Sequence, residues 1–315
     1  MLKFFNCART ILPLSRKKQS IRNLILWGAF ALTIHSVHAM NTEDKERDTY
    51  VLQTGKKGAE RLTEQNEFLK PFSIQHLKNA GLSKGQIVWD IGCGNGAMTE
   101  YLAEMVGETG HVYAMDKSKE QLDIARKNFE SKGFKNVTFI QGDAQSLENL
   151  SIPSADLVYI RFLLLHVPKP EEIIKGVKKL LKPGGVVAAQ EPVMSSAIYN
   201  DLPEYKETLT VVSTKLGFDF DIGKKLPTLY QDAGFNCTVE EHLPVPTPRQ
   251  AKGVNLKGLN ELKAKGFFKV AIQLGHLKQE QLDEWERTIN SWSDTEEGDT
   301  APYYTSPINV YVVAK

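Results

Sequence analysis

The chain has 315 residues, of which 41% are hydrophobic and 24% are charged, a composition typical of a globular protein rather than of a disordered one. Its net charge is +1, but residues 1–39 hold six basic and no acidic residues, so the remaining chain carries a net charge of −5. Because nucleic-acid-binding domains usually carry their excess positive charge on the folded part, this distribution argues against tRNA, rRNA or DNA as a substrate.

Residues 1–39 have the layout of a secretory signal peptide. Basic residues precede an apolar run at 24–34 that is too short for a comfortable transmembrane helix, and residues 37–39 (Val-His-Ala) resemble a cleavage site. Met40 follows at once and opens a polar segment, 41–47, that could begin a cytosolic protein. Two interpretations stay open: the segment directs export, or translation starts at Met40 and the leader is not made.

The next part of the chain, residues 48–85, is predicted to form helices, with Pro71 breaking the run. We assign residues 40–80 to an N-terminal helical cap. Strand and helix patterns then alternate, which predicts a parallel sheet with helices on both faces. The predicted strands are 87–91, 111–115, 137–140, 156–160 and 186–190, and the helices between them include 97–106, one from Ser118 to Gly133, and one introduced by Pro170.

After residue 191 the alternation becomes less regular. Helices are predicted at 203–216 and 224–233, a strand at 237–242, an extended proline-rich linker at 243–248, helices at 251–274 and 279–292, and a last strand at 308–313. The predicted division is a main domain of residues 81–243 and 307–315, with residues 244–306 inserted as a helical lid.

The three cysteines, Cys7, Cys93 and Cys237, are widely spaced. No pair has the spacing of metal ligands, and an odd, scattered set argues against a disulfide framework. We therefore expect a reduced, metal-free fold, in which Cys93 serves as a small residue rather than as a reactive thiol.

A glycine-rich turn follows the first predicted strand. Asp90 closes the strand, and Gly92, Gly94 and Gly96 lead into the next helix. Glycines at alternate positions let the backbone take positive φ angles and pass close to a ligand. On its own, this pattern is only moderately specific.

Two further acidic residues stand at the ends of the following strands. Asp116, which ends the second strand, can accept hydrogen bonds from both hydroxyls of an adenosine ribose, and Asp143, in the sequence Gly142, Asp143, Ala144, is placed for the exocyclic amine of adenine. In open α/β sheets, ligands bind outside the carboxyl ends of the strands. A single aspartate there is as often a helix cap as a ligand, but capping does not explain three in register.

Residues 50–192 resemble the class I S-adenosylmethionine-dependent methyltransferases, in the branch of ubiquinone and menaquinone biosynthesis and other small-molecule enzymes. The motifs that carry the resemblance are residues 90–96, Asp116, residues 142–144 and the turn at 181–185 (Leu-Lys-Pro-Gly-Gly). The resemblance implies a doubly wound, Rossmann-like α/β fold with a seven-stranded sheet whose last strand is antiparallel, so that 237–242 and 308–313 become strands six and seven. Helical additions would stand before strand one and between strands six and seven.

The resemblance also implies residue roles for the cofactor, S-adenosylmethionine. Gly92, Gly94 and Gly96 would pass beneath its methionine part, Asp90 would order its amino end, and Asp116 would hold its ribose. The other cofactor-binding residues expected are Lys117, Asp143, Ala144 and Arg161, of which the last is as well explained by a surface salt bridge.

Methyl transfer from a sulfonium needs mainly alignment of the nucleophile with the methyl carbon, and a base only where the nucleophile must lose a proton. His166, after the fourth strand, and Glu191, at the end of the fifth, are the candidate bases. A packing role is the stronger interpretation for His166, and for Glu191 the two are balanced.

Two other functions fit parts of the pattern. The glycine turn also matches a dinucleotide-binding motif, since Ala97 supplies its last position, which would give an NAD(P)-dependent oxidoreductase. Asp143 and the turn at 182–185 have no part in that interpretation. The second alternative is a non-catalytic protein that keeps the fold and the cofactor.

We expect a small-molecule acceptor, no nucleic-acid partner and no membrane span in the folded domain. A cofactor made in the cytosol favours a cytoplasmic protein, with export or membrane tethering through residues 1–39 as the alternative.

Overall fold

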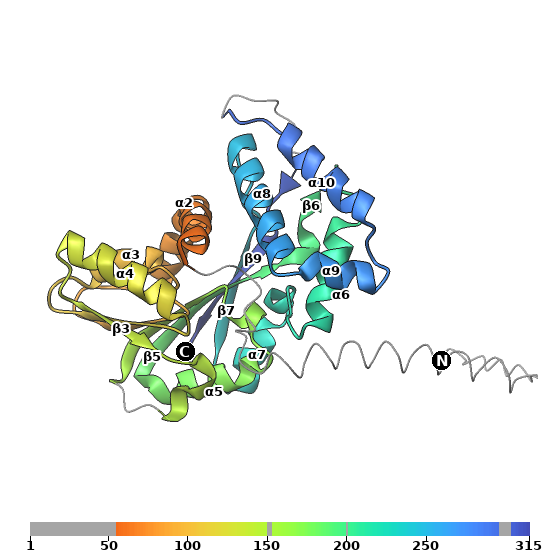
Figure 1. The fold of residues 1–315 in the computed structure, drawn as a ribbon. Helices are drawn as coiled ribbons and strands as arrows, with labels where there is room; N and C mark the ends of the chain where they lie inside the picture. The colour runs from red at the N-terminus through yellow and green to blue at the C-terminus, as the bar shows by residue number, and fades with distance from the viewer. Residues whose placement is uncertain (1–54, 150–152, 200, 296–303) are drawn as a thin grey trace, which may run out of the picture. The chain divides into compact units, whose positions relative to one another are not determined.

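The computed structural model describes residues 55–149, 153–199, 201–295 and 304–315. The predicted leader at 1–39 and the start of the helical cap lie outside these residues. The centre of the fold is a seven-stranded sheet with the strand order β3-β2-β1-β4-β5-β9-β7 (Figure 1). The strands are β1 (Ile87–Ile91), β2 (His111–Asp116), β3 (Val137–Gln141), β4 (Ala155–Arg161), β5 (Leu181–Val193), β7 (Cys237–His242) and β9 (Ile308–Ala314).

Strands β1 to β5 pair in parallel, whereas β9 lies antiparallel between β5 and β7. This arrangement confirms the predicted seven-stranded sheet with an antiparallel last strand. A separate two-stranded sheet joins β6 (Ile198–Tyr199) to β8 (Tyr304–Thr305).

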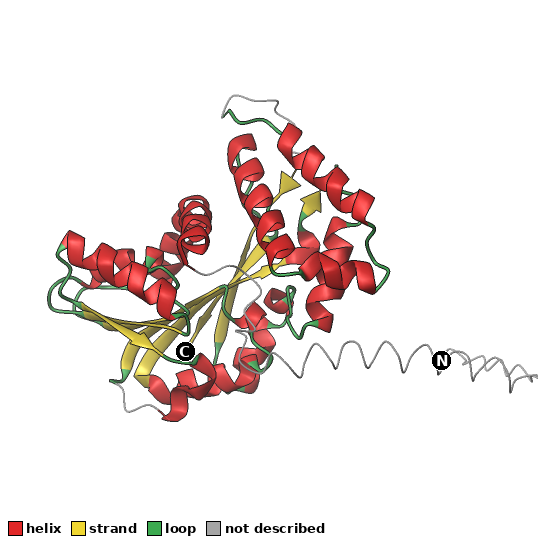
Figure 2. Ribbon diagram, viewed as in Figure 1, coloured by secondary structure: helices red, strands yellow, loops and turns green. Residues whose placement is uncertain are grey.

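Helices cover both faces of the sheet (Figure 2). On one face lie α2 (Gly55–Asn79), α3 (Ala97–Val106) and α4 (Lys119–Lys132), and on the other α5 (Pro170–Leu180) and α7 (Leu226–Asp232). Four more helices gather beyond the sheet: α6 (Tyr205–Lys215), α8 (Pro248–Ala264), α9 (Phe267–Gln273) and α10 (Gln279–Ser291). Short 3-10 turns are η1 (Ala144–Asn149), η2 (Leu164–His166), η3 (Met194–Ser196) and η4 (Ile222–Lys224).

Local sequence explains the limits of several helices. The Ser118 hydroxyl accepts the Gln121 amide at 3.3 Å at the start of α4, and Gly133 ends this helix with a φ of 76°. Thr247 and Gln250 form a reciprocal capping box at the start of α8.

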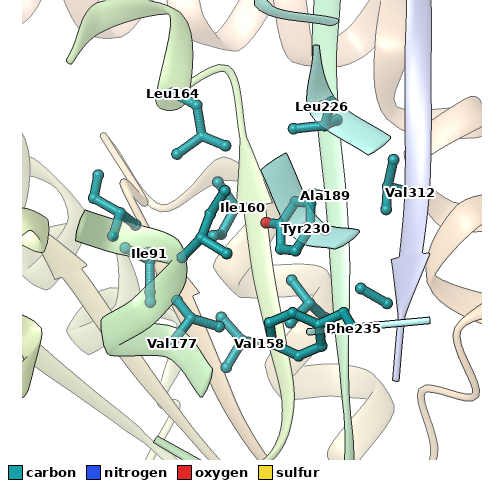
Figure 3. Close-up of a cluster of buried hydrophobic side chains, with 14 of the residues drawn as sticks. Ile91, Val158, Ile160, Leu164, Val177, Ala189, Leu226, Tyr230, Phe235 and Val312 are labelled. Carbon is teal, nitrogen blue, oxygen red and sulfur yellow. The ribbon is translucent and has the colours of Figure 1, made fainter. Parts of the chain in front are cut away.

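Three larger apolar clusters hold the layers together. The first fills the space between the sheet and α5 with α7, and includes Ile160, Leu164, Ala189, Leu226 and Tyr230 (Figure 3). The second packs α3 and the end of α2 on the opposite face. The third joins α6, α8, α9 and α10. The boundaries predicted for the main domain and the insertion stay predictions, and the third cluster includes α6, which precedes β7 in the chain.

Two helix predictions need correction. Pro71 does not break the N-terminal helix but lies inside α2, although proline removes a backbone N–H donor from the helix. The single helix predicted at 251–274 is two helices, because the chain takes a left-handed turn at Gly266, with a φ of 76°. The fifth strand is also longer than predicted and includes the turn at 182–185.

Candidate functional site

The glycine-rich turn between β1 and α3 has the backbone that its sequence predicts. Gly92, Gly94 and Gly96 have φ angles of 79°, 54° and 80°. The amides of Gly92 and Cys93 both donate to the Met115 carbonyl on β2, at 2.8 and 3.0 Å. The turn is therefore anchored to the end of the second strand.

Side chains from three other elements surround this turn closely. A Cβ added at Gly92 would lie 3.2 Å from Leu163, one at Gly94 would lie 3.0 Å from Leu62 of α2, and one at Gly96 would lie 3.0 Å from Phe129 of α4. Positive φ and close neighbours together require glycine at these three positions.

Asp116 is fixed directly to the glycine turn. One carboxylate oxygen accepts the Gly94 amide at 2.8 Å, and the other accepts the Ser118 amide at 2.8 Å. The side chain is half-buried at the carboxyl end of β2. The structure thus brings together two of the predicted site elements, the turn and the carboxylate that is predicted to hold the ribose.

Asp143 lies next to this pair. The Gly142 amide donates to the Asp116 carbonyl at 3.1 Å, and Lys117 lies 3.6 Å from the Asp143 carboxylate. Asp143 also accepts the Gln145 amide at 2.9 Å, so it caps the turn η1 that begins at Ala144. Capping uses one carboxylate oxygen, and the side chain remains 39% exposed.

Asp90 is buried beneath the turn, with 3% of its surface exposed. Its carboxylate accepts the Thr99 hydroxyl from α3 at 2.6 Å. Burial raises the pKa of Asp90 to about 6, while the Thr99 hydrogen bond and the charge of Arg161 oppose the rise.

Arg161 is not involved in a surface salt bridge in the described part of the chain, but in a partly buried polar network beneath α2. Its guanidinium donates to Asn66 at 2.9 Å and to Ser73 at 3.3 Å. Ser73 in turn donates to Gln190 at 2.7 Å, and Gln190 donates to Tyr311 at 3.2 Å.

The two candidate bases meet at one short turn, η2, which contains His166 and donates backbone amides to Glu191. His166 closes η2, half-buried, with its ring edge-on to Phe218 and Phe220 at 6.2 and 6.4 Å between ring centres. Glu191 is fully buried on β5 and accepts the amides of Leu163 and Leu164 at 2.9 and 2.7 Å. The aromatic contacts of His166 agree with the packing interpretation, and a base role for either residue stays a prediction.

Several residues around the site escaped the sequence analysis. Leu62 and Thr63 of α2 lie against the glycine turn, where the Asn95 side chain donates to the Thr63 hydroxyl at 3.2 Å. Thr99 and Ser73 lie on helices, and they were missed because their hydrogen-bond partners lie on strands of the sheet. Thr99 could have been found as the one hydroxyl in the first turn of the helix after the glycines.

Comparison of the sequence with known protein families assigns the chain to one of them. Residues 82–240, just over half of the chain, match the family model of a methyltransferase domain. The chain belongs to this methyltransferase family. Membership confirms the predicted class I fold and S-adenosylmethionine as the cofactor, and it argues against the nicotinamide alternative.

Two curated relatives are demethylmenaquinone methyltransferases. The protein from Anoxybacillus flavithermus is 35% identical over 115 residues, which are 36% of this chain and 48% of the relative. The protein from Staphylococcus aureus (strain MRSA252) is 34% identical over 155 residues, 49% of this chain and 63% of the relative. In these two matches the chain spans less than two thirds of the relative's length.

A solved structure, the YcgJ protein from Bacillus subtilis, is 16% identical to this methyltransferase and covers 77% of this chain and 96% of its own, with a TM-score of 0.50. A likeness at this identity supports the fold alone.

None of the helices in the described residues is long and apolar enough to cross a membrane. Within the same residues, no group of three or more histidine, cysteine, aspartate or glutamate side chains is arranged to hold a metal ion.

Proposed function

We propose that this methyltransferase transfers the methyl group of S-adenosylmethionine to a small-molecule acceptor. The observation that carries the proposal is the Asp116 carboxylate, which is held by the Gly94 and Ser118 amides at the point where the glycine turn meets β2. A carboxylate at this strand end can accept hydrogen bonds from the hydroxyls of a ribose diol.

The residues fit the chemical groups of the cofactor. The three glycines put a backbone without side chains where the methionine part would pass, and a Cβ added at any of them would meet a neighbouring side chain at 3.0–3.2 Å. Asp90, Asp116 and Asp143 concentrate negative charge at one edge of the sheet, which suits a ligand that carries a sulfonium and an ammonium group. Ala144, half-buried beside Asp143, offers an apolar contact for adenine.

When bound, the cofactor supplies a methyl group on an electrophilic sulfur, so the contribution of the protein is alignment and exclusion of water. The glycine turn and Asp116 fix the donor end. Arg161 and the turn after it lie at the carboxyl end of β4, the strand next to β1. We place the acceptor there.

For the methyl acceptor we propose a class only, that of small molecules. The net charge of −5 outside residues 1–39 disfavours nucleic acid, and the name of the curated relatives adds a quinone-type acceptor to the candidates. We propose action in the cytosol, where the cofactor is made.

Calorimetric titration tests the proposal. We expect the protein to bind S-adenosylmethionine and S-adenosylhomocysteine, but not NAD or NADP. Turnover with a panel of small-molecule acceptors then separates an enzyme from a non-catalytic binding protein. If neither sulfur compound binds, the proposed function is wrong.

Asp116→Ala is the matched mutational test. Loss of hydrogen bonds from a carboxylate to the ribose should cost about 2 kcal/mol, or roughly 10- to 100-fold in affinity. Asp123→Ala is the control, since Asp123 is an aspartate of α4 whose carboxylate is 40% exposed and pairs with Lys119. Unchanged cofactor affinity in a folded Asp116→Ala protein would remove Asp116 from the site.

A further inference from the structure

Glu191 is a carboxyl group placed in an apolar core. It lies on β5 opposite Val310 of β9, and none of its surface is exposed. Its side chain shares a face of the sheet with Ala189 and Val193, which belong to the first apolar cluster. Burying a carboxyl group among such side chains is unfavourable unless hydrogen bonds compensate for the loss of water.

The compensating hydrogen bonds come from a single turn. One oxygen of Glu191, Oε1, accepts the amides of both Leu163 and Leu164, at 2.9 and 2.7 Å. These amides belong to the start of η2, where the first backbone N–H groups have no acceptor within the turn itself. The carboxyl group therefore ties the turn after β4 to the end of β5.

The turn requires such support because its first residue is strained. Phe162 has a φ of 52°, in the left-handed region that aromatic side chains rarely adopt. Its own amide still donates to the Gln190 carbonyl at 3.0 Å, so the chain leaves the sheet abruptly at this residue. The strained conformation is what directs the next two amides toward Glu191.

The position of the turn matters on two sides. Leu163 lies against the glycine loop, 3.2 Å from where a Cβ of Gly92 would stand. On the other side, the Leu165 carbonyl accepts the Asp219 amide at 3.1 Å, and His166 packs on Phe218. A shift of the turn would therefore displace both the cofactor loop and the segment that leads to α7.

We propose that Glu191 is a positioning residue, which holds the turn at 162–166 against the glycine loop by accepting two of its backbone amides. This inference rests on the proposed function, because the loop that it positions is the one assigned to the cofactor. Burial also raises the pKa of Glu191 to about 8, so the group is mostly uncharged at neutral pH. A neutral acid and a neutral amide can fill the same role here.

Glu191→Gln and Glu191→Ala separate this role from others. Glutamine keeps an oxygen for the two amides, and its NH2 group replaces Oε2, which has no hydrogen-bond partner in the described part of the chain. Alanine leaves both amides unpaired. Val310→Ala is the control, since Val310 is 3% exposed, belongs to the same cluster and faces Glu191 across the strand pair without bonding the turn.

Two measurements are made on the full chain, below the lowest melting temperature of the set. By calorimetry with S-adenosylhomocysteine, we expect Glu191→Ala to weaken binding at least 10-fold. Glu191→Gln and Val310→Ala should stay within threefold of the unmutated protein. In hydrogen-exchange measurements, the amides of residues 162–166 should exchange faster than in the unmutated protein only in Glu191→Ala, and not in Glu191→Gln or Val310→Ala.

Several results would overturn the proposal. They are a 10-fold loss of affinity in Glu191→Gln, unchanged affinity in a folded Glu191→Ala, or an equal loss in Val310→Ala. If Glu191→Ala does not fold, Glu191→Gln and Val310→Ala still decide. If the unmutated protein binds no S-adenosylhomocysteine, the proposed function fails, whereas the exchange data still test whether Glu191 holds the turn.

Discussion

At the scale of single residues, glycines with the same backbone conformation have different reasons to be glycine. Gly96 stands directly before α3, and Gly133 directly after α4. Their φ angles are 80° and 76°. A Cβ at Gly96 would lie 3.0 Å from Phe129 and 3.3 Å from Ala125, whereas one at Gly133 would have no atom within 4 Å. Glycine at position 133 therefore avoids backbone strain alone, whereas glycine at position 96 avoids both backbone strain and a clash between the glycine turn and α4.

Alanine substitution at the two positions should therefore give unequal results. Gly133→Ala should lower the free energy of unfolding by about 1–2 kcal/mol through left-handed strain. Gly96→Ala should lower it by about 2–4 kcal/mol, since overpacking adds to the strain. Urea denaturation measures both values. Calorimetry should show weaker cofactor binding only for Gly96→Ala, and equal effects of the two variants would show that the loop is not packed as described.

At the scale of elements, α2 is attached to the sheet partly by polar contacts. Leu69 and Leu77 supply apolar burial, but Ser73 is fully buried between them and bonds Gln190 of β5. Asn66 and Ser73 also accept hydrogen bonds from the Arg161 guanidinium at the end of β4. Helix α2 is thereby joined to the strand end that we assign to the acceptor side of the site.

Ser73→Ala tests this attachment. The substitution leaves the buried Gln190 oxygen without its 2.7 Å donor, so we expect a loss of about 1–3 kcal/mol in the free energy of unfolding. Gln75→Ala is the control on the same helix, because Gln75 is exposed and its side-chain amide donates to the exposed Asn79 at 2.9 Å. It should change stability by less than about 0.5 kcal/mol. Comparable losses in both variants would contradict the assignment.

The sequence predicted features that depend on interactions between residues close together in the chain, and it missed those that depend on distant residues. The ends of α4 depend on Ser118 and Gly133, each within a few residues of the helix, and both were found. The seven strands and the antiparallel direction of the last one followed from the alternation of patterns together with the family resemblance. Helix α2 continues through Pro71, where the local sequence pattern predicted a break.

The site divides in the same way. The glycine turn and the strand-end carboxylates form a local pattern, and the structure brings Gly94, Asp116 and Asp143 together as expected. The partners of Glu191 and Ser73 are separated from them by 28 and 117 positions, and their pairing depends on the completed sheet. Sequence alone therefore could not separate a catalytic from a positioning role for Glu191.

At the scale of the whole molecule, three buried titratable groups make folding depend on pH. Burial raises the pKa of Asp90 from 3.8 to about 6 and that of Glu191 from 4.5 to about 8, and it lowers the pKa of His76 from 6.5 to about 4. The two acids stabilise the fold at low pH and lose this contribution as pH rises through 3.8–6 and 4.5–8. His76 stabilises it above pH 6.5 and loses its contribution as pH falls toward 4.

Between pH 6.5 and 8, Glu191 is the group of these three whose protonation differs most between the folded and the unfolded chain, because Asp90 is mostly ionised in both states and the unfolded His76 is appreciably charged only near pH 6.5. The folded carboxyl group retains its proton and the unfolded one has lost it, so the free energy of unfolding attributable to Glu191 should fall by about 2 kcal/mol across this interval. Tyr230, whose pKa is raised above its ordinary value of 10 by burial and then by the charge of Glu191, stays protonated throughout. Urea denaturation at pH 6.5, 7.25 and 8 should show this fall in the unmutated protein and a smaller one in Glu191→Gln. The same pH dependence in both proteins would show that Glu191 is already ionised in the folded state.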